Sequence, residues 1–277
     1  RLNILDKFVD YFVIVESIFT HKGEKRNLKF NINKFKKFES KIKYLVYDQE
    51  PSQIKKIFSK DTEDEKSRKY IMNALFRENA QRNFINGALN NLDNEDVILV
   101  SDVDEIPNLK GINFKEKKSK IILFKQDMLY YKFNLKLPNL AWTGTKACKK
   151  KYFKSAQWLR NVKDRKYRFY RVDTYFSEKK YINCEFVDNG GWHFTNIKTA
   201  KQIKQKLESY LHHIEFDKNP LSAEDINKII QDKIAIYDLS VDQTKNKVRG
   251  NKLENYPLHK LPKYLQDNLN DYKVWID

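Results

Sequence analysis

A short apolar run followed at once by acidic residues, at positions 97–107, constrains the fold more than any other part of the sequence. The run Val97–Val100 is largely β-branched, which predicts a short buried strand. Asp102 and Asp104 follow where that strand should end. Ligands of open α/β sheets collect beyond the carboxyl ends of the strands. The pattern therefore predicts an α/β fold with a ligand site at the end of this strand.

The two aspartates are candidate ligands of one divalent cation. Residues two apart on extended backbone point to the same side, so Asp102 and Asp104 would face one ion. Carboxylate oxygens suit Mg²⁺ or Mn²⁺, and such a metal usually also binds substrate phosphates. A polar turn that ends a strand is the alternative interpretation of a bare Asp-x-Asp. The adjacent Glu105 makes the acidic cluster dense and favours the metal.

Further segments extend the prediction of an α/β fold. Continuous apolar runs at 11–15, 44–47 and 121–124 resemble the first strand, and strands that are apolar on both faces predict a mixed, mostly parallel central sheet flanked by helices. Helical periodicity is found around 77–92, from Ala200 to Ile214, and from about Ser222 onward. The segment 241–255 is polar and poorly periodic, and is expected to be a loop.

The domain organisation is expected to be simple. The sequence has no internal repeat and no Gly/Ser-rich linker, so we expect one catalytic domain over residues 1–240, with residues 241–277 as an extension packed on the same domain. The chain begins inside an amphipathic pattern, which suggests that upstream sequence, such as a first strand, precedes Arg1. Whether that upstream sequence includes a membrane anchor is left open.

Composition narrows the class of protein. The chain has 54 Lys and Arg against 37 Asp and Glu, a net charge of +17, which favours anionic partners. No recognisable nucleic-acid motif accompanies that charge, so no nucleic-acid partner is expected. No apolar run approaches the roughly 20 residues that span a bilayer, and no signal peptide is present, so a cytoplasmic or membrane-peripheral location is expected. Neither Cys148 nor Cys184 lies in a C-x-x-C motif, so a zinc or redox motif is not supported. Two buried thiols are expected, and a single disulfide is the alternative.

A second constellation, D-N-G-G-W-H-F at 188–194, combines unusual backbone with ligand-type side chains. Two adjacent glycines permit a close approach to a ligand. Trp192 offers a flat face on which a sugar or base would stack, and His193 is a candidate metal ligand or acid/base group. A tight turn with a core Trp and a hydrogen-bonded His is the alternative interpretation.

Three arginines are candidate diphosphate ligands. Arg165 and Arg168 belong to a basic run with a period of three, and forked guanidinium groups bind diphosphates well. Arg82 lies on the side of its expected helix opposite Phe84, where it would face either solvent or a ligand. Solvated basic faces are the alternative for all three. Dinucleotide-binding and P-loop motifs are absent from the sequence, which excludes those nucleotide-binding classes.

An ordered set of strings resembles glycosyltransferase family 17, over roughly Arg1 to Phe216. The most specific string is S-D-V-D-E-I-P, and the ordered set is much stronger than any one piece. The strings are V-D-Y-F-V-I-V-E-S (Val9–Ser17), R-E-N-A-Q-R-N (Arg77–Asn83), S-D-V-D-E-I-P (Ser101–Pro107), G-G-W-H-F (Gly190–Phe194) and K-L-E-S-Y-L-H-H-I-E-F (Lys206–Phe216).

The resemblance implies a GT-A-type nucleotide-sugar-binding fold, an inverting mechanism and a UDP-sugar donor, with N-acetylglucosamine as the sugar and a glycan as the acceptor. It also implies a divalent metal, usually Mn²⁺. Carried over by position, Asp102 and Asp104 would form the metal-diphosphate motif, Glu105 would lie close to the sugar, and His193 would be a later metal ligand.

Inverting transfer needs a carboxylate that takes the proton of the acceptor hydroxyl. Asp188 is the first choice for this base and Glu185 the second, because both precede the glycine pair. Two alternatives remain open from the residues alone. One is nucleotidyl or sugar-phosphate transfer on a similar fold, and the other is a basic nucleic-acid-binding domain without catalysis.

Overall fold

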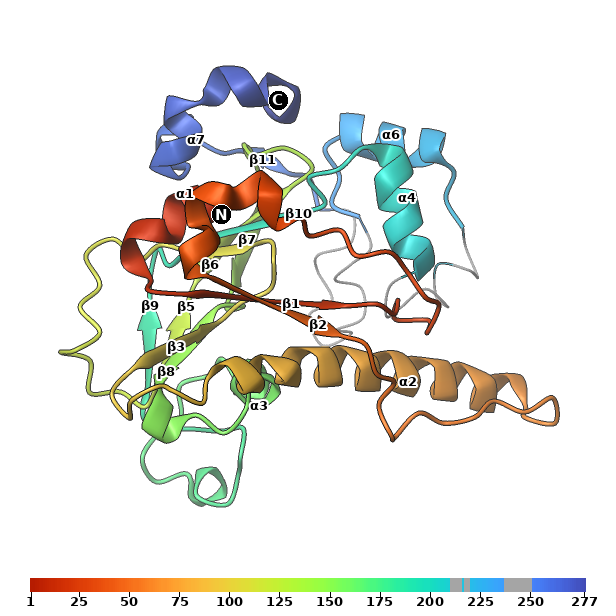
Figure 1. Ribbon diagram of the computed structural model, residues 1–277. Helices are drawn as coiled ribbons and strands as arrows, with labels where there is room; N and C mark the ends of the chain where they lie inside the picture. The colour runs from red at the N-terminus through yellow and green to blue at the C-terminus, as the bar shows by residue number, and fades with distance from the viewer. Residues whose placement is uncertain (210–215, 217–219, 237–250) are drawn as a thin grey trace. The chain divides into compact units, whose positions relative to one another are not determined.

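The computed structural model describes residues 1–209, 216, 220–236 and 251–277 (Figure 1). The chain forms two compact units. The first comprises Arg1–Phe8, Leu92–Ala200 and Glu224–Asp277, and the second comprises Val9–Asn91 and Lys201–Ala223. The expected boundary at residue 240 and most of the expected loop at 241–255 lie outside the described residues.

A four-stranded sheet of the first unit contains the strand that precedes the acidic cluster. Its order is β3 (Val97–Val100), β8 (Lys146–Lys149), β5 (Ile121–Phe124) and β9 (Cys184–Val187). β8 is antiparallel to both of its neighbours, whereas β5 and β9 are parallel. β5 is buried along its whole length, as its continuous apolar sequence predicts. Cys148 on β8 and Cys184 on β9 are free thiols, as expected.

A five-stranded sheet completes the strands of the first unit. Its order is β11 (Glu254–Asn255), β7 (Leu135–Trp142), β6 (Gln126–Tyr130), β10 (Gly191–Thr195) and β4 (Glu105–Pro107). Only the β10–β6 pair is parallel. At the β10–β4 contact, Gly191 has φ +127°, and a Cβ there would overlap the carbonyl oxygen of Ile106. This close approach explains why a glycine begins β10.

Short helices surround these sheets in the first unit. α3 packs against β3 and β8, and α1 lies against α7. The helices are α1 (Leu2–Leu5), α3 (Ala156–Asn161), α6 (Ala223–Gln231) and α7 (Lys263–Asp267), with 3₁₀ turns η1 (Asp6–Phe8), η4 (Lys150–Tyr152), η5 (Val172–Thr174), η7 (Leu258–Lys260) and η8 (Leu269–Trp275).

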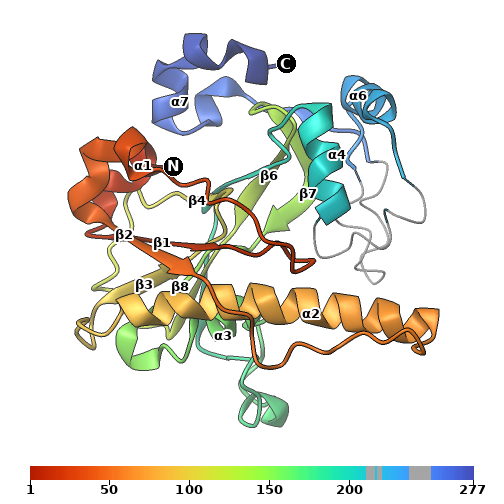
Figure 2. The same cartoon turned by 45° about the vertical axis from the view of Figure 1, so that its right-hand side comes forward.

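The second unit is built on a parallel pair of strands and a long helix. β1 (Phe12–Ser17) pairs in register with β2 (Ile42–Tyr47), and α2 (Glu63–Asn83) packs beside β1 (Figure 2). Thr62 and Glu65 form a capping box that fixes the start of α2. The other elements of this unit are η2 (Ile32–Lys41), η3 (Phe84–Ala88) and most of α4 (Ala200–Ser209).

The predicted α/β class is confirmed, and the expected strands lie at or near their predicted positions. The helix expected around 77–92 is found only in part, because α2 ends at Asn83 and the 3₁₀ turn η3 follows it. The mostly parallel central sheet is not confirmed. Both sheets of the first unit are mixed, and antiparallel pairs predominate in them, whereas the two-stranded sheet β1–β2 of the second unit is parallel. A continuous apolar run indicates that both faces of a strand are buried, but it does not indicate whether the neighbouring strands are parallel or antiparallel. Residues 210–214 of the expected Ala200–Ile214 helix lie outside the described residues.

None of the described helices combines the length and the apolar character that crossing a lipid bilayer requires.

Candidate active site

The acidic cluster lies on the turn between β3 and β4. The backbone N–H of Glu105 donates to the carbonyl oxygen of Asp102 (3.1 Å), which closes a four-residue turn, and Val103 at its tip is 87% exposed. The backbone here is a turn and not the extended segment that the spacing argument assumed, so whether both aspartates face one ion stays a prediction. Because the chain turns here, the side chains of Asp102 and Asp104 meet different partners.

Glu105 is the buried anchor of this turn. Its side chain is fully buried, and its Oε1 accepts hydrogen bonds from Trp142 Nε1 (2.7 Å) and Arg160 Nη1 (3.0 Å). Its Oε2 accepts from the backbone N–H of Asp102 (2.9 Å) and from Arg160 Nη1 (2.8 Å). A buried charge is tolerated only when it is paired and hydrogen-bonded, and Glu105 meets both conditions. It is therefore placed to hold the turn in shape from beneath.

Arg160, on α3, joins both acidic side chains. Its Nη2 donates to Asp102 Oδ2 (2.7 Å), while its Nη1 donates to Glu105 and to the carbonyl oxygen of Gly144. A Cβ at residue 144 would overlap Glu105 Oε1, so the approach requires glycine there. The Arg1 guanidinium adds hydrogen bonds to the carbonyl oxygens of Asp102 and Glu105. The acidic turn is thus held by side chains from three separate segments.

Asp104 faces His193 across the β4–β10 pair. His193 is the register partner of Glu105, and the backbone N–H of Phe194 donates to the carbonyl oxygen of Asp104 (2.9 Å). This pairing brings His193 Nε2 to 3.4 Å from Asp104 Oδ2. His193 Nδ1 is buried and has no hydrogen-bond partner. The strand pairing thus joins the Asp-x-Asp and G-G-W-H segments, which lie far apart in the sequence.

The Asp104–His193 pair fits a divalent cation in donor type and spacing. Adjacent ligands of one octahedral ion with bonds of about 2.1 Å lie about 3 Å apart, close to the 3.4 Å found here. Among the described residues, no group of three or more His, Cys, Asp and Glu side chains forms a ready-made metal site. Mg²⁺ and similar ions usually take one or two carboxylates from the protein and complete their shell with substrate phosphates and water, so two protein ligands suffice.

Trp192 is a core residue rather than an open stacking platform. It alternates with His193 along β10, is 9% exposed, and donates from Nε1 to the carbonyl oxygen of Lys260 (2.9 Å). This placement favours the core interpretation of the G-G-W-H segment. Another tryptophan, Trp142, has its ring 5.2 Å from the imidazole of His193 and is closer to the acidic turn.

The two candidate bases each form an ion pair with a lysine. Asp188 is exposed, and its Oδ1 lies 2.7 Å from Lys125 Nζ, which lowers the pKa of the Asp188 carboxyl. Glu185, on β9, pairs with Lys117 (2.5 Å). Asp188 precedes the end of β10 that pairs with Pro107, whereas His193 pairs with Glu105 farther along.

The three predicted arginines are divided between the two units. Arg165 and Arg168 are exposed on the segment between α3 and β9, where Arg168 donates to the hydroxyl of Tyr170 (2.8 Å). Arg82 belongs to α2 in the second unit and pairs there with Glu78 (2.7 Å). The structure thus brings Asp102, Asp104, Glu105 and His193 together, and places Arg165 and Arg168 on a solvated surface.

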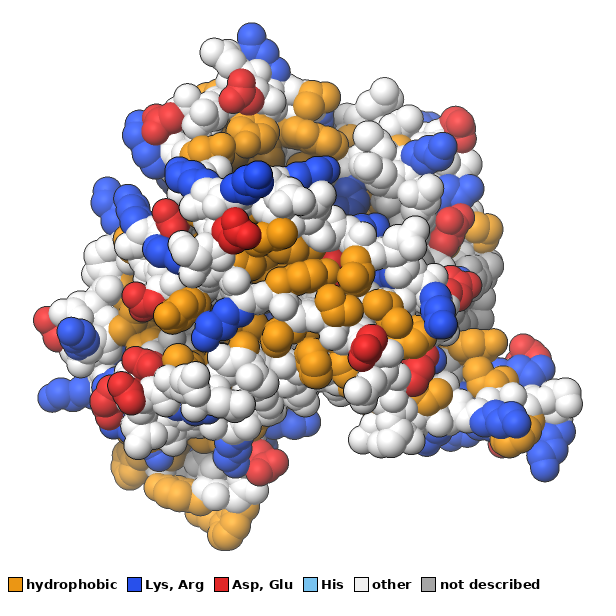
Figure 3. Space-filling view, in the orientation of Figure 1, with side chains coloured by type: hydrophobic (Ala, Val, Ile, Leu, Met, Phe, Trp, Pro, Cys, Tyr) orange, Lys and Arg blue, Asp and Glu red, His pale blue; other side chains and the backbone are white. Residues whose placement is uncertain are grey.

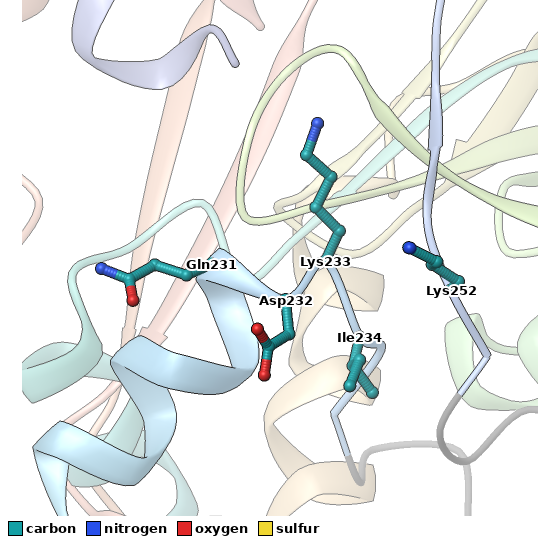
Figure 4. A pocket seen from close by; sticks show the side chains of 5 residues that line it. All are labelled: Gln231, Asp232, Lys233, Ile234 and Lys252. Atoms are coloured by element: carbon teal, nitrogen blue, oxygen red, sulfur yellow. The ribbon is translucent and has the colours of Figure 1, made fainter.

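A hollow of about 670 Å³ lies elsewhere in the first unit, beside the end of α6 (Figure 4). Its lining contains no residue of the acidic turn and no predicted site residue. It is lined by Gln231, Asp232, Lys233, Ile234 and Lys252. The candidate active site is therefore defined by side-chain chemistry rather than by this hollow.

Lys146, on β8, lies beneath the acidic turn and was not predicted from the sequence. It is 5% exposed, and its Nζ donates to the carbonyl oxygens of Arg160 (2.6 Å) and Val162. Burial, with a further contribution from the charge of Arg160, lowers the pKa of Lys146 to about 8. Since α3 carries Arg160, this lysine also fixes the end of the helix that holds the turn.

The lowered pKa of Lys146 predicts a specific pH dependence of stability. The unfolded chain keeps its proton up to the ordinary value of 10.5, whereas the folded chain releases it near pH 8, so the free energy of unfolding should rise across this window by up to about 3 kcal/mol. Denaturant unfolding of the wild type and of Lys146→Met across this range measures the effect. The variant should lack this rise, and equal pH slopes in both proteins would contradict the lowered pKa.

The whole chain was compared with protein-family models, curated proteins and solved structures. The family model of glycosyltransferase family 17 matches residues 1–276, essentially the whole chain. No curated protein and no solved structure gave a significant match.

Proposed function

Since this chain belongs to glycosyltransferase family 17, we propose that it transfers N-acetylglucosamine from a UDP donor to a glycan hydroxyl, with inversion and with a divalent cation. Membership makes the chain a glycosyltransferase, and it implies a nucleotide-sugar donor and a glycan acceptor. The sugar, the nucleotide, the metal and the stereochemistry are the proposed parts, as is the assignment of the mixed α/β architecture to the GT-A type.

The observation that carries the proposal is the Asp104–His193 pair on a turn that is already held in place. A carboxylate and an imidazole 3.4 Å apart are suitable ligands for Mn²⁺ or Mg²⁺. Asp104 comes from the Asp-x-Asp string and His193 from the G-G-W-H string, which lie far apart in sequence. Their convergence is expected of a site and is not needed for a turn that merely ends a strand.

A divalent cation held by Asp104 and His193 would supply Lewis-acid stabilisation of the negative charge that develops on a leaving nucleoside diphosphate. Asp102 has a different part in this proposal. Its Oδ2 is bound by Arg160, but its side chain remains 41% exposed, so it faces incoming ligands while its charge is held in place. The role of Glu105 is to position the turn, since a fully buried carboxylate cannot touch a sugar.

The carboxylate that accepts the proton remains a proposal, with Asp188 first and Glu185 second. A general base works best when its pKa lies near the operating pH. Lys125 lowers the pKa of Asp188, which keeps that carboxylate ionised but reduces its affinity for a proton. The base would therefore require Lys125 to move away when the acceptor binds.

A thermal-shift panel tests the donor and the metal together. We expect UDP and UDP-N-acetylglucosamine to raise the Tm of the full chain in the presence of Mn²⁺ and to have little effect without it, because ligands that bind the folded state stabilise it by mass action. GDP-, CMP- and dTDP-sugars serve as matched comparisons. A larger shift with one of these would replace the UDP donor, and equal shifts with and without Mn²⁺ would contradict the metal requirement.

Product analysis separates glycosyl transfer from the alternative transfer chemistry. Release of UDP from the donor in the presence of a glycan is expected. Release of UMP would indicate sugar-phosphate transfer, and release of pyrophosphate from a nucleoside triphosphate would indicate nucleotidyl transfer. Either of these outcomes would contradict the proposed reaction.

A further inference from the structure

The segment 163–180, here called the aromatic-basic loop, joins α3 to β9 in the first unit. Its two ends are tied together. The backbone N–H of Lys163 donates to the carbonyl oxygen of Lys179 (2.7 Å), and Trp158 Nε1 on α3 donates to that of Glu178 (2.8 Å). In Figure 1 the loop projects below α3, in green and teal. Its base is therefore anchored while the rest of the loop extends away from the sheets.

Large apolar side chains of this loop are turned to solvent. Outside this loop, and apart from Val103 and Val274, no large hydrophobic side chain among the described residues is more than 54% exposed. Figure 3 shows hydrophobic side chains at the lower edge of the molecule, in the region of this loop. The exposed fractions are 78% for Phe169, 56% for Tyr170, 66% for Val172, 73% for Tyr175 and 86% for Phe176. Clustered exposure of this kind marks an interaction surface.

The same loop is strongly basic. It contains seven Lys and Arg against three Asp and Glu, a net charge of +4. Within the loop, Asp173 pairs with Arg171 (2.8 Å) and with Lys180 (2.7 Å), which ties these basic side chains together around η5. Arg165, Lys166 and Arg168 are exposed just before the aromatic residues. Positive charge thus surrounds the apolar tip.

We propose that the aromatic-basic loop docks this enzyme on an anionic lipid bilayer. Phe and Tyr rings enter the headgroup region, where an apolar body and a polar tip are both accommodated. Lys and Arg beside them are attracted to the negative surface of such a membrane. The two features occur on one projecting loop, so one surface satisfies both. The proposal is independent of the donor and metal assigned to the acidic turn.

The form of the loop favours a membrane over two other occupants. Single-stranded nucleic acid binds basic grooves in which aromatic rings stack on successive bases. Here the apolar side chains lie at the end of a projection, which suits insertion into a headgroup layer. A second copy of the chain would bring the same net positive charge against itself, which opposes association. An anionic bilayer instead complements the charge.

Co-sedimentation of the full chain with lipid vesicles tests the proposal. We expect binding to vesicles of phosphatidylcholine with phosphatidylserine, and much weaker binding to phosphatidylcholine alone. The double variant Phe169→Ser, Phe176→Ser should bind the anionic vesicles at least about tenfold more weakly, because two apolar side chains no longer leave water. Val274→Ser is the matched control, since it removes an exposed apolar side chain from the C-terminal segment and should leave binding unchanged.

A charge-reversal pair tests the electrostatic half of the proposal. Lys166→Glu with Lys179→Glu should weaken binding by at least about 30-fold, because each basic residue near the surface contributes about 1 kcal/mol and reversal adds repulsion. The control is Lys260→Glu with Lys273→Glu, which makes the same change in net charge in the C-terminal segment. Its effect should be less than about threefold, since charges beyond a Debye length are screened.

Several outcomes would overturn the proposal. If the serine double variant binds anionic vesicles as the wild type does, the aromatic rings do not contribute to binding. If both charge-reversal pairs lose the same affinity, binding depends on net charge and not on this loop. A wild-type dimer that the serine variant converts to monomers would assign the loop to self-association. Binding of the full chain to RNA, without binding to anionic vesicles, would assign the aromatic-basic loop to nucleic acid. The serine variant should keep the Mn²⁺-dependent Tm shift with UDP, so failure of lipid binding and failure of the donor assignment remain distinguishable.

Discussion

Asp104→Asn should abolish Mn²⁺-dependent stabilisation by UDP and lower the transfer rate on the order of 10³-fold or more. The amide keeps the size of the side chain but removes the charge that, with His193, would hold the cation. Stabilisation of the leaving diphosphate by a metal amounts to several kcal/mol, which sets the size of the effect. Thermal shift with UDP and Mn²⁺, together with the rate of UDP release, measures both consequences.

Val103→Ala is the matched control for this substitution. Val103 lies between the two aspartates, but its side chain is 87% exposed, so its truncation should change neither UDP binding nor the rate. Asp102→Asn tests the other aspartate. It should lower activity and, because Asp102 pairs with Arg160, also lower the Tm. An Asp104→Asn protein that binds UDP with Mn²⁺ as the wild type does would overturn the assigned site.

Arg160→Met should lower the free energy of unfolding by about 3–5 kcal/mol, which corresponds to a Tm lower by roughly 10 °C. The loss is large because Glu105 would stay fully buried without its ionic partner. The Asp102 carboxylate and the carbonyl oxygen of Gly144 would lose a donor as well. Denaturant unfolding monitored by circular dichroism measures the change.

Two further variants separate a buried ion pair from general damage. Arg165→Met makes the same chemical change at an exposed arginine and should cost no more than about 0.5 kcal/mol. In the double variant Arg160→Met, Glu105→Gln, the buried charge is gone, so part of the lost stability should return. A double variant with the full sum of both single losses would contradict the view that the two side chains stabilise each other.

The parts of the fold predicted from sequence are those in which local chemistry is decisive. Val97–Val100 and Ile121–Phe124 form strands with the predicted bounds, because short apolar runs rich in β-branched residues favour a buried strand. The start of α2 was missed although Thr62 and Glu65 form a recognisable capping box, so that signal was present in the sequence. Strand direction was not predictable, since burial on both faces gives the same composition in either direction.

The candidate site was predictable only in part, for a similar reason. Asp102, Asp104 and His193 belong to strings of unusual composition, and the structure brings Asp104 and His193 together. The sequence around Arg160, Trp142 and Gly144 has no distinctive motif. These residues contribute to the site only because α3 and the end of β7 pack beside the acidic turn. The directions of the Asp102 and Asp104 side chains could not be predicted from their spacing. A spacing of two fixes side-chain direction only on extended backbone, and here the backbone turns.

Under the proposed donor site, the anchoring of the acidic turn has a consequence for the entropy of binding. The turn is already fixed without a ligand, because the Glu105 carboxylate accepts from the backbone N–H of Asp102 and Arg160 donates to the Asp102 carboxylate. Donor binding at the proposed site would then have little entropy of loop ordering to overcome in this turn, and such preorganisation would leave more of the contact energy available as affinity. Selection among nucleotide sugars would accordingly depend on how well each one fits a rigid receptor, and not on a closing movement of this segment.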